Sequence, residues 1–166
     1  MGWRIATSTA ETSGTSTSAT DLVCVVYRGQ LSSGTPIGTF QPSAGTTNTV
    51  TYAVDALTKS NVTGDSWFVA FAGHRSADTT IESPPVGMSL IAASALVASS
   101  SEVCAFDTNN PATANWPSTD VAISGTASGW QTVVIEIKAE GAGYRFQNYQ
   151  AVRGGGSVMG FSERID

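Results

Sequence analysis

The apolar residues of this chain fall into short runs, and this pattern restricts the fold to β-strands. The runs are rich in β-branched and aromatic side chains and are separated by Gly, Pro, Ser, Thr and Asn. No segment shows the apolar spacing of a convincing amphipathic helix. Eight strands are predicted, over residues 4–7, 22–28, 49–53, 66–74, 87–92, 102–107, 121–125 and 131–138.

Two of these runs predict strands with apolar side chains on both faces. Residues 22–28 contain the near-continuous run LVCVVY, which is typical of a strand covered on both sides. Residues 66–74 place Trp67 and Val69 on one face and Phe68 and Ala70 on the other. We therefore expect residues 66–74 to form a central strand.

The segments between the strands are long and rich in turn-forming residues. Residues 29–45 contain Pro36 and Pro42 and are interpreted as a turn-rich connection, and residues 78–85 as a loop. Residues 92–99 fit either a strand or one helical turn. Eight short strands with such connections predict an all-β domain over residues 1–139, a two-sheet antiparallel β-sandwich of jelly-roll type.

The last 27 residues differ from the rest and are interpreted as an extended C-terminal arm, residues 140–166. They combine glycines, aromatics and arginines, and a glycine run at residues 154–156 suggests a hinge. Aromatic and arginine side chains are frequent anchors of protein interfaces. The predicted interface residues of the arm are Tyr144, Arg145, Phe146, Tyr149, Arg153, Phe161 and Arg164.

Charge and composition argue against several partners. The net charge is -5, and Lys59 and Lys138 are the only lysines, so a surface that neutralises phosphates is not expected. Ser and Thr make up 42 of the 166 residues and give a neutral hydroxyl-rich surface. No apolar stretch is long enough to span a bilayer, and no signal peptide is recognised. Cys24 and Cys104 lie in apolar runs and are expected to be buried thiols, with one disulfide as the alternative.

Residues with catalytic or metal-binding chemistry are few, and no catalytic, cofactor or metal site is predicted. His74 has Arg75 nearby, but a histidine at a strand end explains it, and Ser66 in GDSW opens an apolar strand. Residues 107–110 offer oxygen ligands for calcium, but ordinary turn chemistry is the preferred explanation for them. Trp116, in a Pro-flanked loop, is the tryptophan proposed as a possible surface contact.

Four stretches of the chain, in this order, carry a likeness to a known group of proteins. They are Gly2-Trp3-Arg4; residues 21–29, DLVCVVYRG; residues 66–76, SWFVAFAGHRS, continuing to PPVGMSL at 84–90; and residues 123–139, ISGTASGWQTVVIEIKA. Their order resembles bacteriophage virion β-sandwich proteins of the capsid decoration, cement or tail-associated type. Such relatives commonly carry additional strands before the Gly-Trp element, so a sheet edge is expected to lie uncovered here.

The resemblance implies a virion structural protein, foremost a capsid decoration or cement protein that binds the outer capsid surface and stabilises capsomer contacts. The implied partners are the major capsid protein or another virion protein, and further copies of the chain, with a trimer favoured. Synthesis in the host cytoplasm and a final location in the virion follow. An extended piece of the arm, about residues 144–152, would then complete a sheet edge of its own or of an adjacent subunit.

Two other functions remain open at this point. A tail or fibre-associated module that recognises host glycan would use Trp116 and the loops at one end of the sandwich. A jelly-roll hydrolase would depend on His74 or Glu136, but paired carboxylates at an apolar strand end are not evident. No cofactor, nucleic acid or membrane partner is expected under any of the three.

Overall fold

The computed structural model describes residues 23–28, 34–46, 49–62, 64–75, 81–94, 101–108, 112, 114–127, 129–139 and 147–153, and every regular element among them is a β-strand. Within these residues no helix is long and apolar enough to cross a membrane. All strand pairs are antiparallel. The sequence-based prediction of an all-β antiparallel sandwich is therefore confirmed.

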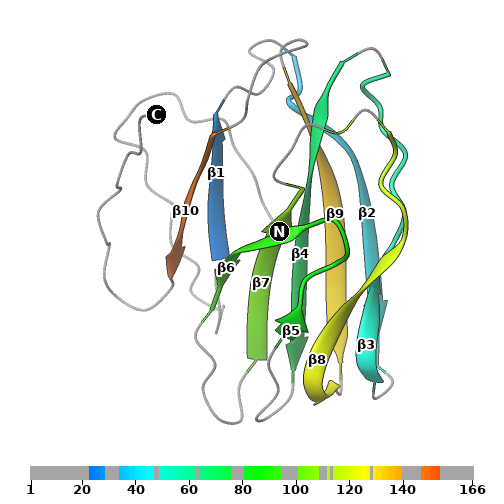
Figure 1. The fold of residues 1–166 in the computed structure, drawn as a ribbon, viewed down its shortest axis with the longest axis vertical. Helices are drawn as coiled ribbons and strands as arrows, with labels where there is room; N and C mark the ends of the chain where they lie inside the picture. Colours follow the sequence, from blue (N-terminus) through cyan, green and yellow to red (C-terminus); the bar gives the residue numbers. More distant parts are fainter. Residues whose placement is uncertain are drawn as a thin grey trace.

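Two sheets face each other in the order of a jelly roll (Figure 1). The larger sheet has the order β2-β9-β4-β7-β6, and the smaller one the order β3-β8-β5. From β2 to β5 each successive strand lies in the other sheet. β6 and β7 both lie in the larger sheet, β8 lies in the smaller sheet, and β9 lies in the larger one again. The strands are β2 (Ile37–Gly45), β3 (Thr49–Val54), β4 (Ser66–Arg75), β5 (Ile81–Ser83), β6 (Ser89–Ala93), β7 (Ser101–Asp107), β8 (Thr119–Ala127) and β9 (Trp130–Lys138).

A third, two-stranded sheet lies on the other side of the larger sheet. It consists of β1 (Val23–Arg28) and β10 (Gln147–Arg153), which pair with Val23 opposite Arg153 and Arg28 opposite Gln147. β1 lies against β6 and β7, and β10 lies against β6. The chain thus forms three layers, with the five-stranded sheet in the middle.

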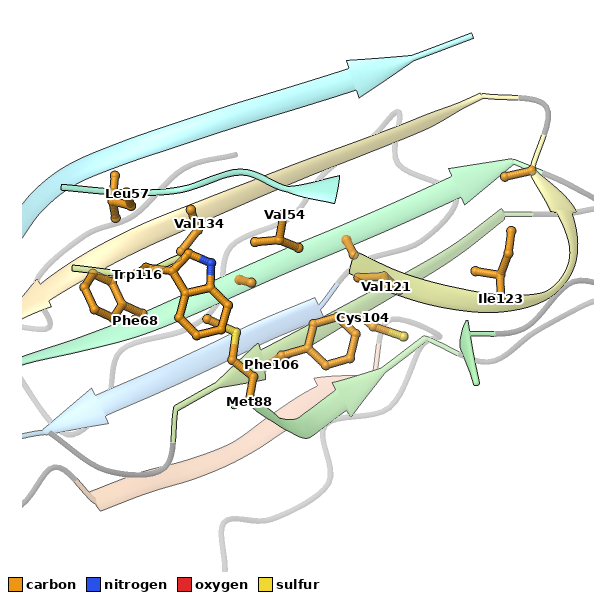
Figure 2. Close-up of a cluster of buried hydrophobic side chains, with 13 residues drawn as sticks. Val54, Leu57, Phe68, Met88, Cys104, Phe106, Trp116, Val121, Ile123 and Val134 are labelled. Carbon is orange, nitrogen blue, oxygen red and sulfur yellow. The ribbon is translucent and has the colours of Figure 1, made fainter. Parts of the chain in front are cut away.

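The main hydrophobic core fills the space between the two larger sheets (Figure 2). The central strand β4 contributes Phe68, Ala70 and Ala72 to it, as its alternation predicted. Its members are buried apolar side chains from both sheets and from the loops that join them: Val54, Leu57, Phe68, Ala70, Ala72, Met88, Cys104, Phe106, Trp116, Val121, Ile123, Ala127 and Val134.

A second, smaller cluster lies on the opposite face of the larger sheet. Trp67, Val69 and Ile137 are buried there, and Tyr27 of β1 packs against them. Because successive side chains of a strand point to opposite faces, the odd-numbered residues of β4 belong to this cluster and the even-numbered ones to the main core. β4 is therefore covered on both faces, as a central strand requires.

Four of the outer strands carry an extra residue relative to the strand they pair with. In β2 the register advances by three residues from Ile37 to Phe40, while β9 advances by two. The same excess of one residue occurs on β5 against β8, on β6 against β7 and on β10 against β1. Such bulges bend and twist a strand. β1 and β3 are the described outer strands that have no extra residue of their own.

Three strand predictions need correction. β2 lies within residues 29–45, which were expected to be a connection, because a proline is tolerated on an outer strand and Pro42 sits in β2 opposite Val133. β5 lies within the expected loop at 78–85 and is only three residues long. The apolar strand β1 was expected to be covered on both faces, but its residues 23–27 are all half-buried. The predicted strand at residues 4–7 lies outside the described residues.

Candidate docking layer

Tyr27 attaches β1 to the larger sheet. Its ring meets the ring of Trp67 edge-on, with centroids 5.9 Å apart and an interplanar angle of 69°. Its hydroxyl donates a hydrogen bond to Oδ2 of Asp107 at 3.1 Å, and Asp107 is fully buried. Burial, followed by the negative charge of Asp107, raises the pKa of Tyr27 far above its usual range. Tyr27 is therefore held as a neutral donor that pins β1 in place.

The face of β1 turned away from the sheet is also apolar. Because β1 has a regular register, alternation places Cys24 and Val26 on the face opposite to Tyr27, and both are half-buried. A strand that forms an outer layer normally carries polar side chains on its solvent face. On β1, Cys24 and Val26 make this outer face apolar instead. We call the sheet of β1 and β10 the docking layer.

The predicted interface residues of the arm divide into two groups. Tyr149 and Arg153 lie on β10, opposite Val26 and Val23 of β1. The extended piece predicted at about residues 144–152 overlaps β10, and it pairs with a strand of the same chain. Tyr144, Arg145, Phe146, Phe161, Arg164 and the glycine run at 154–156 lie outside the described residues.

Trp116 was predicted as a surface contact, and this prediction is wrong. Its side chain is only 5% exposed and belongs to the main core, where its ring lies 6.1 Å from that of Phe68 (Figure 2). Backbone hydrogen bonds in both directions between Trp116 and Leu57 hold this loop against the loop that follows β3. Trp116 is therefore buried because its Pro-flanked loop turns inward over the core.

Glu136 of β9 is a fully buried carboxylate surrounded by hydrogen-bond donors. Oε2 accepts from the backbone N–H of Thr39 at 3.2 Å and from the N–H and hydroxyl of Ser60 at 2.8 and 2.6 Å. Oε1 accepts from the N–H of Asn61 at 3.0 Å and from the hydroxyl of Ser66 at 2.7 Å. The Thr39 hydroxyl lies 3.4 Å from Oε2 but donates more closely to Thr58 O, at 2.6 Å. Glu136 thus joins β9 to β2, to β4 and to the loop after β3.

This environment makes Glu136 a structural group rather than a proton donor or acceptor for a substrate. Burial alone would raise the pKa of Glu136, but the hydrogen bonds from Ser60, Ser66 and Asn61 outweigh it and lower the pKa to about 2. Five donors occupy the acceptor positions of the carboxylate. Ser66, the serine of GDSW, is itself buried, and its hydroxyl donates a hydrogen bond to Glu136.

Lys59 closes the same end of the sandwich beside Glu136. Its side chain is buried, and Nζ donates to the carbonyl oxygens of Gly64 at 2.8 Å and Ala112 at 2.9 Å. Its backbone N–H donates to Oδ1 of Asn115 at 3.0 Å. This buried ammonium group fixes the two loops relative to each other, because losing either hydrogen bond would leave part of its desolvation free energy uncompensated.

The remaining chemical candidates also lie inside the fold. His74 lies at the end of β4, as its interpretation as a strand-end histidine predicted, and it is buried there opposite Glu102 of β7. Asp107, the first residue of the possible calcium loop, is fully buried and accepts from Tyr27, while Asn109 and Asn110 lie outside the described residues. Among the residues described, no group of three or more His, Cys, Asp and Glu is placed to hold a metal ion.

Cys24 and Cys104 are both free thiols; Cys104 is buried, as predicted, whereas Cys24 is only half-buried. Cys24 lies on β1, whereas Cys104 faces the main core from β7, on the other side of the larger sheet. The Cys104 thiol donates to Oε1 of Glu102 at 3.5 Å. Burial, together with the charge of Glu102, raises the pKa of Cys104 well above its usual range.

Comparisons with known proteins return nothing: no family model matches the chain, and neither a curated protein nor a solved structure shows significant similarity to it.

Proposed function

We propose that this chain is a structural protein of a bacteriophage virion, foremost a capsid decoration or cement protein. The observation that carries the proposal is the docking layer, in which Cys24 and Val26 present an apolar outer face on a strand pinned by Tyr27. A partner that covers this face would bury apolar surface at little cost in conformational entropy, because the strand is already fixed in place. The location in a virion is inferred from the resemblance of the four sequence stretches to bacteriophage virion β-sandwich proteins.

The interior supports a scaffold role. Glu136, Asp107 and Lys59 are charged groups whose described hydrogen bonds hold strands and loops together. A protein that reinforces a capsid needs rigidity, and such buried, hydrogen-bonded groups fix one arrangement of the chain. The glycan-binding alternative loses its proposed contact, because Trp116 belongs to the core.

The proposed partners are the major capsid protein or another virion protein, with further copies of the chain, a trimer being favoured. The contact would be made by the docking layer and by the aromatic and arginine residues of the arm, of which Tyr149 and Arg153 lie on β10. The partner surface should be neutral and apolar opposite β1, because burying a charge against Cys24 and Val26 would be unfavourable.

Reconstitution on phage heads tests the proposal. The purified chain is mixed with undecorated heads and with isolated tails, and binding and its symmetry axis are determined by cryo-microscopy. Val26→Glu should abolish binding to heads while the chain remains folded. Val62→Glu is the matched control, because Val62 is 87% exposed in the loop after β3.

Three results would overturn parts of the proposal. Binding to neither particle would reject the virion role. Binding to tails alone would reject capsid decoration. Equal binding of the Val26→Glu variant and the wild type would show that the docking layer is not the contact surface.

A further inference from the structure

The bulge of β2 is built around the carboxylate of Glu136. At the register shift of the two strands, Gly38 and Thr39 of β2 together face the single residue Glu136 of β9. At this bulge the backbone N–H of Thr39 donates to Oε2 of Glu136 at 3.2 Å. A Cβ atom at position 38 would overlap the carboxylate, so the glycine leaves the room that the carboxylate fills. Both residues of the bulge are therefore fitted to a carboxylate group, in line with the use of bulges to re-aim local groups.

The loop after β3 and the start of β4 supply the other donors. Oε2 accepts from the N–H and the hydroxyl of Ser60, and Oε1 accepts from the N–H of Asn61 and the hydroxyl of Ser66. Successive backbone N–H groups that converge on one point are typical of anion-binding sites. We call the N–H groups of Thr39, Ser60 and Asn61 and the hydroxyls of Ser60 and Ser66 the carboxylate cradle.

The carboxylate cradle is also held by hydrogen bonds that do not involve Glu136. The hydroxyl of Thr39 donates to the carbonyl oxygen of Thr58 at 2.6 Å and ties the bulge to the loop. The side-chain amide of Asn61 donates to the carbonyl oxygen of Asp65 at 2.9 Å. The buried ammonium group of Lys59 fixes the same loop through two further carbonyl oxygens. The donors are thus positioned by their own surroundings, which is the condition for a preorganised site.

The charge preference of the carboxylate cradle is also clear from Glu136. Although burial raises the pKa of this residue, the hydrogen bonds lower it to about 2. The cradle therefore favours a carboxylate over the neutral acid. Thr39 and Ser60 are exposed residues, so the cradle lies directly beneath the surface of the protein.

We propose that the carboxylate cradle is a binding site for a small monocarboxylate, which the chain fills with its own Glu136 side chain. A free carboxylate should take this place when the side chain is shortened. Glu136→Ala removes a carboxymethyl group, which acetate matches in size, and Glu136→Gly removes a carboxyethyl group, which propionate matches. The proposal does not depend on the virion function.

Chemical rescue of Glu136→Ala tests the proposal. The variant is refolded from urea at pH 7 in increasing sodium acetate, with sodium chloride keeping the ionic strength constant, and the urea midpoint is followed by tryptophan fluorescence. The midpoint should rise with the logarithm of the acetate concentration, as for a ligand that binds only the folded chain. Acetamide, which has a similar shape but no charge, should give no such rise. The wild type and Asp120→Ala, at an exposed position on β8, are the controls.

Two further variants locate the bound acetate. Glu136→Ala/Ser66→Ala lacks one donor of the cradle and should bind acetate about tenfold more weakly, because a hydrogen bond to a charged group is lost. Glu136→Ala/Ser83→Ala is the matched control, since Ser83 is exposed on β5. Propionate should stabilise Glu136→Gly more than Glu136→Ala, which retains the Cβ atom.

Four outcomes would overturn the proposal. The first is a midpoint of Glu136→Ala that responds to acetate no more than that of the wild type. The second is an equal rise with acetamide. The third is failure of Glu136→Ala to refold at any acetate concentration, which would show that the donors are not held without the side chain. The fourth is undiminished rescue of the Ser66→Ala double variant, which would place the acetate elsewhere.

Discussion

Glu136→Gln is expected to destabilise the fold by about 3 kcal/mol at pH 7. The pKa of Glu136 is lowered from 4.5 to about 2, and at 1.36 kcal/mol per pH unit this shift corresponds to about 3 kcal/mol in favour of the ionised, folded form. The hydrogen bonds give a similar figure. A glutamine amide must direct its NH2 group either at the backbone N–H of Asn61 or at those of Ser60 and Thr39. Either orientation leaves a buried donor unsatisfied, at a cost of about 1 to 3 kcal/mol. The substitution also removes the negative charge from the hydrogen bonds that remain.

The pH dependence separates this mechanism from a simple packing effect. Because the folded-state pKa is depressed, the contribution of the carboxylate is complete above the unfolded pKa of about 4.5 and is lost as the pH falls toward 2. Urea unfolding followed by tryptophan fluorescence, at pH 7 and at pH 2.5, should show a gap between wild type and Glu136→Gln that shrinks at low pH. Asp120→Asn, at an exposed position on β8, is the control. A gap below about 1 kcal/mol at pH 7, or one that is unchanged at pH 2.5, would refute the reasoning.

Gly38→Ala tests the same network from the β2 side. A Cβ atom at Gly38 would overlap the carboxylate of Glu136, which its donors hold in place, and it would come within 2.7 Å of the Ser60 hydroxyl. The expected loss is about 2 to 4 kcal/mol by urea unfolding. Because both substitutions act through one carboxylate, the double variant Gly38→Ala/Glu136→Gln should lose clearly less than the sum of the single losses. Additive losses would mean that Gly38 matters for another reason.

Three further substitutions or labels test other parts of the fold. Tyr27→Phe leaves Asp107 without one of its donors and should cost about 1 to 3 kcal/mol in urea unfolding, so an unchanged midpoint would contradict the anchoring role. Trp116→Ala should cost about 3 to 5 kcal/mol because it empties a core position, whereas loss of glycan binding at unchanged stability would restore the surface-contact hypothesis. In the native protein a thiol reagent should modify Cys24 and leave Cys104 unreacted until unfolding, and a mass two hydrogens lower without reductant would instead indicate a disulfide.

Most strands could be predicted from sequence, and the two that could not, β2 and β5, are both outer strands. The predicted bounds of β4 and β9 differ from the observed ones by one residue each. Their apolar side chains, on both faces of β4 and in alternation on β9, form patterns that are typical of strands. β2 was missed because Pro42 and the neighbouring glycines indicate turns, although an outer strand tolerates them. β5 was missed because three residues carry no periodicity.

The polar network was invisible in the sequence for a different reason. The donors to Glu136 lie 70 to 97 residues away along the chain, and serine and threonine are so frequent here that none of them stands out. One signal was present: Glu136 is a single carboxylate inside the apolar run VVIEIK, and a charge in a buried strand demands partners. Asp107 gives the same signal at the end of β7, and Trp116 shows that a loop position does not predict exposure.

The extra residues on β2, β5, β6 and β10 have a consequence for how molecules of this chain behave when crowded together. A sheet grows from one molecule into the next when two outer strands are straight enough to form a continuous ladder, and a bulge on either strand breaks that ladder. Four of the six described outer strands are poor templates for such growth. Many copies could therefore be held side by side at high local density and remain separate folded units, with contact between molecules directed to the few places where the backbone runs straight.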